Sequence, residues 1–256
     1  MRDNLKFLFN RAVTILRHKG PVELSRGFIR YLRWKYPFIE VKLRHQYNKI
    51  NYGNSVANPF KIVHINPQNI NRTTSKFATF HHVGCIKGGS WDRNATPVED
   101  HPKYRAVEQH FSEGIPWEET GLFEHYEDVL RTQGQVDGHR SMNELKERYE
   151  RIDEIFKDIR DNGFKSPSEV SESKLCKKEK LDYPAINIGR DGELIFGVGW
   201  HRFTISQVLN LDSIPVRIIA RHESWQRKRS QFENGVMSGV YKDHPDLQDI
   251  GNPECK

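Results

Sequence analysis

The most constraining feature of this sequence is the segment 185–220, in which strand, turn and helix patterns follow one another without a gap. Two short strand-like stretches flank a tight-turn sequence, and a loop with two glycines then leads into an apolar helical pattern and a further strand. The successive segments are 185–188, 190–193, 194–196, 197–202, 203–209 and 216–220. This order predicts a domain that mixes helices with a small sheet, the α+β class.

The loop of this segment has the sequence Gly197-Val198-Gly199-Trp200-His201-Arg202. Glycines between a strand and a helix let the backbone approach a ligand, and the first N–H groups of the helix favour an anion. His201 and Arg202 would begin that helix, where an arginine can bind phosphate through two parallel hydrogen bonds. The loop therefore predicts a phosphate site formed by Gly197, Gly199, Trp200, His201 and Arg202. The alternative is a tight turn with local bonds only, and the spacing leaves both open.

The clearest helix is predicted over residues 141–162. Ser141 and Glu144 have the spacing of a capping box, and Gly163 stands where the helix would end. A strand is predicted at 61–65. The remaining expected segments are helices at 101–112 and 116–126, a linker at 48–59 and a polar loop at 165–182.

The sequence resembles the core of the ParB/sulfiredoxin-like superfamily. The resemblance is carried by Asp191-Gly192 in the turn, the G-x-H-R phrase of the loop, the I-P-V phrase before the last strand, and the Ile159-Arg-Asp-Asn-Gly163 phrase. It covers residues 60–222 and implies a small mixed sheet with flanking helices. Residues 1–50 would then be a basic helical segment that precedes the domain, and 223–256 a basic helix with an irregular tail.

The resemblance implies a nucleotide site and one of three functions. Sulfiredoxins place a catalytic cysteine where this chain has Trp200, which excludes their chemistry because no thiolate is available. Chromosome-partitioning ParB proteins continue into a helix-turn-helix domain, for which the residues after Ala220 are too few. The third branch comprises small-molecule kinases, such as free-serine kinases. We therefore expect a phosphotransferase that uses ATP or ADP, with CTP as a further nucleotide. The alternative is a non-catalytic module, nucleotide-gated or associated with DNA.

Phosphoryl transfer also needs a metal ion and a carboxylate that orients the acceptor hydroxyl. Asp92, which follows Gly88-Gly89, is the predicted base or Mg²⁺ ligand, and His201 is the second predicted catalytic residue. The alternative for Asp92 is a role in a cap or turn. Glu99 and Asp100 are weaker candidates. Trp91 and Trp200 either wall the pocket or pack in the core.

The charge of the chain is concentrated at its N-terminus. Residues 1–50 hold twelve Lys and Arg against three acidic residues, so of the total of +6 this segment carries +9 and the remainder −3. Helical patterns at 5–16 and 21–36 combine these cations with apolar residues. They can pack on the body, lie on an anionic membrane, or bind nucleic acid, the least favoured of the three.

No apolar stretch is long enough for a membrane span or a secretory signal, so we expect a cytoplasmic protein. The three cysteines lack the spacing of a zinc site or a disulfide framework. We expect the arginines between 221 and 229 to face solvent.

Overall fold

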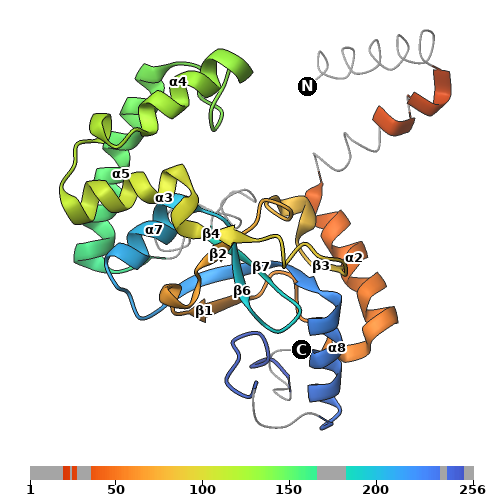
Figure 1. Cartoon of the computed structure of the whole chain (residues 1–256). Helices are drawn as coiled ribbons and strands as arrows, with labels where there is room; N and C mark the ends of the chain where they lie inside the picture. Colours follow the sequence, from red (N-terminus) through yellow and green to blue (C-terminus); the bar gives the residue numbers. More distant parts are fainter. Residues whose placement is uncertain (1–19, 24, 28–35, 166–182, 237–240, 251–256) are drawn as a thin grey trace.

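A computed structural model describes residues 20–23, 25–27, 36–165, 183–236 and 241–250 (Figure 1). The helices expected at 5–16 and 21–36 lie largely outside these residues. The described part of the chain has an α+β fold with a small mixed sheet and flanking helices, as the sequence predicts.

The sheet is organised around β7, all nine residues of which are buried. This strand pairs antiparallel with β1 and parallel with β5 and β3, and the order across the sheet is β1-β7-β5-β6-β2-β4. The strands are β1 (Ile62–Ile65), β2 (Arg72–Thr73), β3 (Cys85–Lys87), β4 (Thr96–Pro97), β5 (Ala185–Ile188), β6 (Leu194–Val198) and β7 (Ile214–His222).

The helices gather at two ends of the sheet (Figure 1). At one end lie α3 (Pro102–Glu108), α4 (Leu122–Gln133), α5 (Met142–Asn162) and α7 (Trp200–Val208), and at the other α2 (Pro37–Tyr52) and α8 (Glu223–Glu233). Short helical turns complete the chain: η1 (Gly53–Ser55), η2 (Pro67–Asn69), η3 (Phe80–His82), η4 (Val98–Asp100), η5 (Gln109–Glu113) and η6 (Trp117–Glu119). Among the described residues, no helix is both long and apolar enough to cross a bilayer.

The local signals of the sequence account for several elements. The predicted helix 141–162 is α5, whose Ser141 side chain accepts a hydrogen bond from the backbone N–H of Glu144. The predicted strand 61–65 is β1. The predicted strands, loop and helix of 185–220 are β5, β6, the loop, α7 and β7 in that order. The expected helix at 116–126 is only partly right, because η6 and α4 occupy residues 117–133.

The predictions for residues 36–59 are wrong, because α2 occupies much of this range. Pro37 was expected to end a helix, yet it begins one, a position that suits its fixed φ. The expected linker at 48–59 likewise starts inside α2. The helix was missed because its buried face is mostly polar. Besides Val41, it carries Asn48 and Arg44, which donate hydrogen bonds to the carbonyls of Gly84 and Val83.

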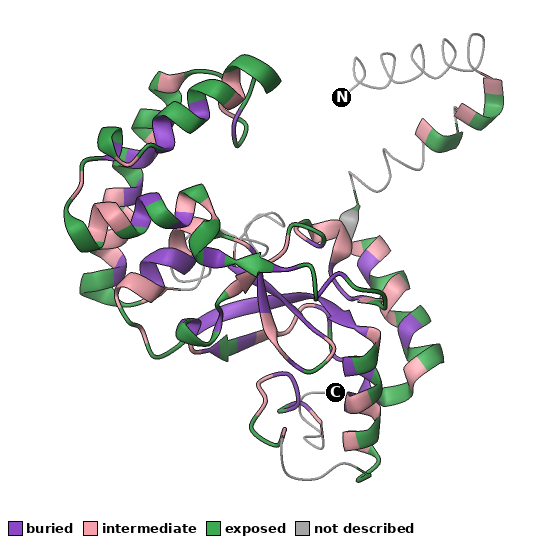
Figure 2. Ribbon diagram, viewed as in Figure 1, coloured by how far each residue is buried: buried purple, intermediate pink, exposed green. Residues whose placement is uncertain are grey.

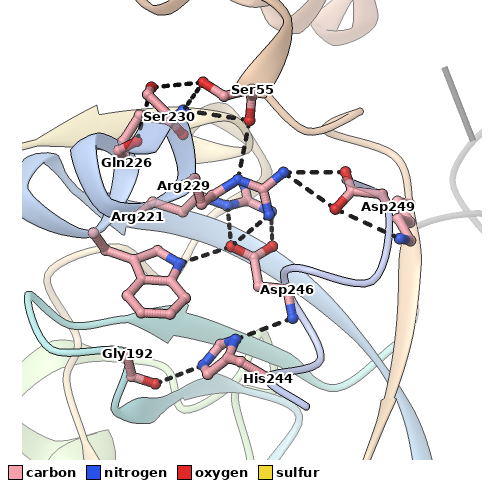
Figure 3. A network of polar contacts seen from close by, with 11 residues as sticks. Ser55, Gly192, Arg221, Gln226, Arg229, Ser230, His244, Asp246 and Asp249 are labelled. Atoms are coloured by element: carbon pink, nitrogen blue, oxygen red, sulfur yellow. Dashed lines mark hydrogen bonds and ion pairs between the residues drawn. The ribbon is translucent and has the colours of Figure 1, made fainter. Parts of the chain in front are cut away.

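The expectation that the arginines after residue 220 face solvent is wrong for two of them. Arg221 and Arg229 are 5% and 1% exposed, and both pair with the buried Asp246 (Figure 3). Asp249 adds a second carboxylate at Arg229. This network joins β7, α8 and the segment after residue 240. Trp225 of α8 belongs to the same core cluster as the central strands.

Candidate functional site

The glycine loop joins β6 to α7 as the sequence predicts. Strand β6 ends at Val198, and Gly199 is the N-cap of α7 with φ +98°, in the left-handed region that glycine tolerates. The first backbone hydrogen bond of the helix runs from Phe203 N–H to Gly199 O, at 3.1 Å. Helix geometry therefore leaves the N–H groups of Trp200, His201 and Arg202 outside the intrahelical ladder, at the positive end of the helix dipole.

The two glycines are required by the chain itself. A Cβ at Gly197 would lie 3.1 Å from both the carbonyl oxygen of Ala185 and the side-chain nitrogen of Asn187. One at Gly199 would lie 2.9 Å from Cα of Pro184. Close packing thus explains both residues without a ligand. The case for an anion rests on the helix end and on the side chains around it.

Arg202, in the first turn of α7, lines a cavity of about 220 Å³ beside the last turns of α5. Lys165 also lines this cavity and donates a hydrogen bond to Asp158 at 2.7 Å. Glu154 and Asp158, one helical turn apart on α5, bring two carboxylates to the same space. The hydrogen bonds from Lys165 and Asn162 lower the pKa of Asp158, which is therefore ionised. The cavity holds cations and carboxylates together.

His201 points toward α5, where its Nε2 lies 3.0 Å from the hydroxyl of Tyr149. That hydroxyl lies 2.8 Å from the hydroxyl of Tyr126, so a buried chain of hydrogen bonds links α7, α5 and α4. Burial lowers the pKa of His201 to about 3, with a further contribution from the nearby cations Lys103 and Arg148. The imidazole is therefore neutral at pH 7. It brings no positive charge to a phosphate, and its assignment as a catalytic residue stays a prediction.

Trp200 packs into the fold. Its ring stacks on His101 with centroids 3.8 Å apart and contacts Phe196 at 4.5 Å. Burial lowers the pKa of His101 to about 4, which keeps this stack uncharged. Of the two interpretations for Trp200, core packing describes these contacts. Only the backbone N–H of Trp200 remains in a position to bind an anion.

Asp92 lies away from this loop. It is 4% exposed and accepts hydrogen bonds from the backbone N–H of Arg190 at 3.0 Å and from its guanidinium at 2.7 Å. Burial raises the pKa of Asp92, but these hydrogen bonds outweigh it and hold the pKa far below the usual value of an aspartate. Arg190 precedes β6 and Gly199 follows it, so the length of the strand, about 13 Å, separates the two sites.

The Gly88-Gly89 loop also lies on the other face of the sheet. Trp91 and Phe77, 5.1 Å apart, pack with Ile195 on one face, whereas Phe196 and α7 pack on the opposite one. A groove of about 640 Å³ adjoins this loop, with Trp91 as part of its wall. The structure thus does not bring Asp92 or Trp91 together with His201 and Arg202. The role of Asp92 as base or Mg²⁺ ligand stays a prediction, and its contacts are those of a turn residue.

The two weaker acidic candidates, Glu99 and Asp100, are exposed in η4. Asp100 pairs with Arg105 at 3.2 Å, and the guanidinium of Arg105 also donates a hydrogen bond to the carbonyl of Glu99. These contacts fix the start of α3 and place neither carboxylate in the cavity of Arg202.

The residues that sequence reasoning missed are the carboxylates of α5. Glu154 and Asp158 were passed over because the helix was analysed for its buried apolar stripe. Their four-residue spacing, with Asp158 directly before the Ile159–Gly163 phrase, was the available signal.

Comparison of the chain with known families, curated proteins and solved structures finds no match. The resemblance to the ParB/sulfiredoxin-like superfamily therefore stays a prediction, which the α+β fold is compatible with at the level of class.

Proposed function

We propose that this protein binds the phosphates of a nucleotide at the N-terminal end of α7 and transfers a phosphoryl group to a hydroxyl. The acceptor is a small molecule or a membrane-associated metabolite, and the donor is ATP or ADP, with CTP as a further nucleotide to test. The observation that supports the proposal is the cavity of Arg202, where cations, carboxylates and a helix N-terminus lie together.

Each group in this cavity has a part in such chemistry. Arg202, Lys165 and the N–H groups of the first turn of α7 neutralise phosphate charge, the main requirement of phosphoryl transfer. Magnesium ions at such sites are held by one or two carboxylates together with the phosphates of the substrate. Glu154 and Asp158 fit this requirement, and an ionised Asp158 can also orient the acceptor hydroxyl.

His201 acts in this proposal through position rather than charge. Its hydrogen bond to Tyr149 ties the first turn of α7 to the middle of α5, two turns before Glu154 and Asp158. The neutral imidazole thereby holds the anion-binding helix end in a fixed position relative to the carboxylates. Preorganisation of this kind lowers the cost of charge stabilisation during the reaction.

Calorimetric titration with ATP, ADP and CTP in the presence of Mg²⁺ tests binding. We expect Arg202→Gln to weaken binding at least about tenfold, because a charge-assisted hydrogen bond contributes roughly 1.5–3 kcal/mol. The matched control is Arg227→Gln, since Arg227 is exposed on α8 and pairs with Glu223. Absence of binding by all three nucleotides would contradict the proposal.

Turnover is tested separately, by the release of the product nucleotide in the presence of hydroxyl-bearing acceptors. Asp158→Asn should retain nucleotide binding and lose turnover. If the wild type binds nucleotide but transfers phosphate to no acceptor, the alternative function, a nucleotide-gated binding module, is the better description.

A further inference from the structure

An exposed apolar stripe runs along α2. Ile39, Leu43, Tyr47 and Ile50 are 55%, 66%, 66% and 84% exposed. Their spacing of four, four and three residues places them on one side of the helix. In the part of the chain that the structure describes, only Val22, Tyr36 and Val236 are comparably exposed among the large apolar residues. Such a concentration on one helix face marks an interaction surface.

The opposite side of α2 fixes the helix to the body, so the stripe cannot turn inward. Val41 is fully buried. Asn48 donates a hydrogen bond to the carbonyl of Gly84 at 2.8 Å, and Arg44 donates one to the carbonyl of Val83 at 2.7 Å. Figure 2 shows the consequence: exposed and half-buried residues follow the outer side of α2, at the edge of the molecule away from α4 and α5.

Cations border this stripe. Lys42 and Lys49 are exposed and one helical face apart from the anchoring residues, at about 60–80° from Ile39 and Leu43 for 100° per residue. The sequence of residues 1–50, which includes α2, carries +9, whereas the remainder of the chain carries −3. The face that bears the apolar stripe therefore belongs to the strongly basic part of the protein, and its charge complements an anionic surface.

The combination of chemistries identifies the kind of surface. Nucleic-acid backbones attract lysine but provide no medium for isoleucine and leucine side chains. The interface of an anionic bilayer accepts both, with apolar side chains at the acyl boundary and lysines at the headgroup phosphates. Tyrosine, here Tyr47, is enriched at the same depth. The length of α2, about 24 Å for its 16 residues, would then lie in the plane of the membrane.

We propose that α2 docks this protein on an anionic lipid bilayer, with Ile39, Leu43, Tyr47 and Ile50 inserted at the interface and Lys42 and Lys49 on headgroup phosphates. Because its other face is fixed to the sheet, docking also sets the orientation of the whole body against the membrane. This inference is independent of the proposed nucleotide site, which lies at the far end of the sheet (Figure 1).

The test is co-sedimentation of the full chain with vesicles of phosphatidylcholine alone and with vesicles in which half of the lipid is phosphatidylserine. We expect binding to the anionic vesicles only, weakened by added salt. The double variant Leu43→Gln/Ile50→Gln should bind about tenfold more weakly or worse, because it removes two inserted apolar side chains. The control Val236→Gln replaces an exposed apolar residue outside the stripe and should bind as the wild type does.

Two further measurements on the same proteins decide between this proposal and its rivals. Urea unfolding reports whether another segment of the chain covers the stripe, and light scattering reports whether a second copy does. The proposal requires that the double variant unfold at the same urea concentration and keep the same molar mass as the wild type. A destabilised variant, a change of molar mass, or equal vesicle binding by wild type and variant would overturn it.

Discussion

At the scale of single residues, His201 shows how burial changes the chemistry that a sequence motif indicates. Its position beside Arg202 suggests a second cation at a phosphate, yet its ring is bonded to Tyr149 and its pKa is lowered to about 3. A histidine of this kind contributes to the hydrogen bonding of the fold in its neutral form. Asp92 is a parallel case, since a carboxylate that looks available in the sequence is bonded to Arg190.

The buried state of His201 predicts a specific loss of stability in acid. The pKa of His201 rises from about 3 in the fold to about 6.5 on unfolding, so below pH 6.5 the unfolded chain binds the additional proton. The free energy of unfolding should therefore fall as the pH drops from 6.5 toward 3, by up to about 1.4 kcal/mol per pH unit from this group. His201→Gln removes that contribution and should flatten the slope.

Urea unfolding at a series of pH values measures this difference. The matched control is His64→Gln, at an exposed position of β1, which should keep the slope of the wild type. Parallel slopes for wild type and His201→Gln would show that His201 is not held neutral in the folded protein.

At the scale of elements, the start of α7 depends on the backbone of Gly199. Gly199→Ala forces a Cβ both into the left-handed region and to 2.9 Å from Cα of Pro184. Gly121, the N-cap of α4, has φ +72° but open space around its Cα, so Gly121→Ala carries the backbone cost of about 1 kcal/mol alone. We expect Gly199→Ala to lower the free energy of unfolding by at least about 1 kcal/mol more than Gly121→Ala does.

Thermal and urea unfolding of the two variants give this comparison directly. Equal destabilisation would mean that the approach of Pro184 does not constrain residue 199, and that the tight packing of the loop is not what requires glycine there.

The elements that the sequence predicts well are those with local signals. The Ser141 cap and Gly163 define α5, and the turn at 190–193 with its flanking apolar residues defines β5 and β6. By contrast, β2 and β4 have two residues each and exist only through pairing with distant strands. Helix α2 was hidden because polar side chains anchor it, through contacts that become visible only when Val83 and Gly84 lie beside it.

The candidate site shows the same division. Arg202 follows from a motif of adjacent residues, and the loop has the predicted strand-to-helix geometry. Glu154 and Asp158 come to it from another helix, and the separation of Asp92 depends on which end of β6, and which face of the sheet, each residue occupies. Such relations between distant segments are set by the packing of the sheet.

At the scale of the whole molecule, the buried ion network holds the C-terminal segment onto the sheet. Asp246 accepts from Arg221 and from the indole of Trp225, and lies 3.2 Å from Arg229 (Figure 3). Burial raises the pKa of Asp246, and the two arginines outweigh this and keep it ionised. Asp246→Asn leaves two buried cations short of a counter-charge, which should lower the free energy of unfolding by about 3–5 kcal/mol.

Urea unfolding of Asp246→Asn beside Asp243→Asn tests this prediction, since Asp243 lies exposed in the same segment. We expect a change within about 0.5 kcal/mol for Asp243→Asn. A similarly small effect at Asp246 would show that the network does not hold the segment in solution.

The central claim is that nucleotide phosphates bind at the N-terminal end of α7, and amide NMR tests it most directly. Titration of the isotopically labelled protein with ATP and Mg²⁺ should shift the backbone amide signals of Trp200, His201 and Arg202 most, because their N–H groups would donate to the phosphates. The amides at the start of α8, at Ser224 and Trp225, provide a reference helix end and should stay unchanged. Shifts concentrated elsewhere, or none at saturating nucleotide, would contradict the account.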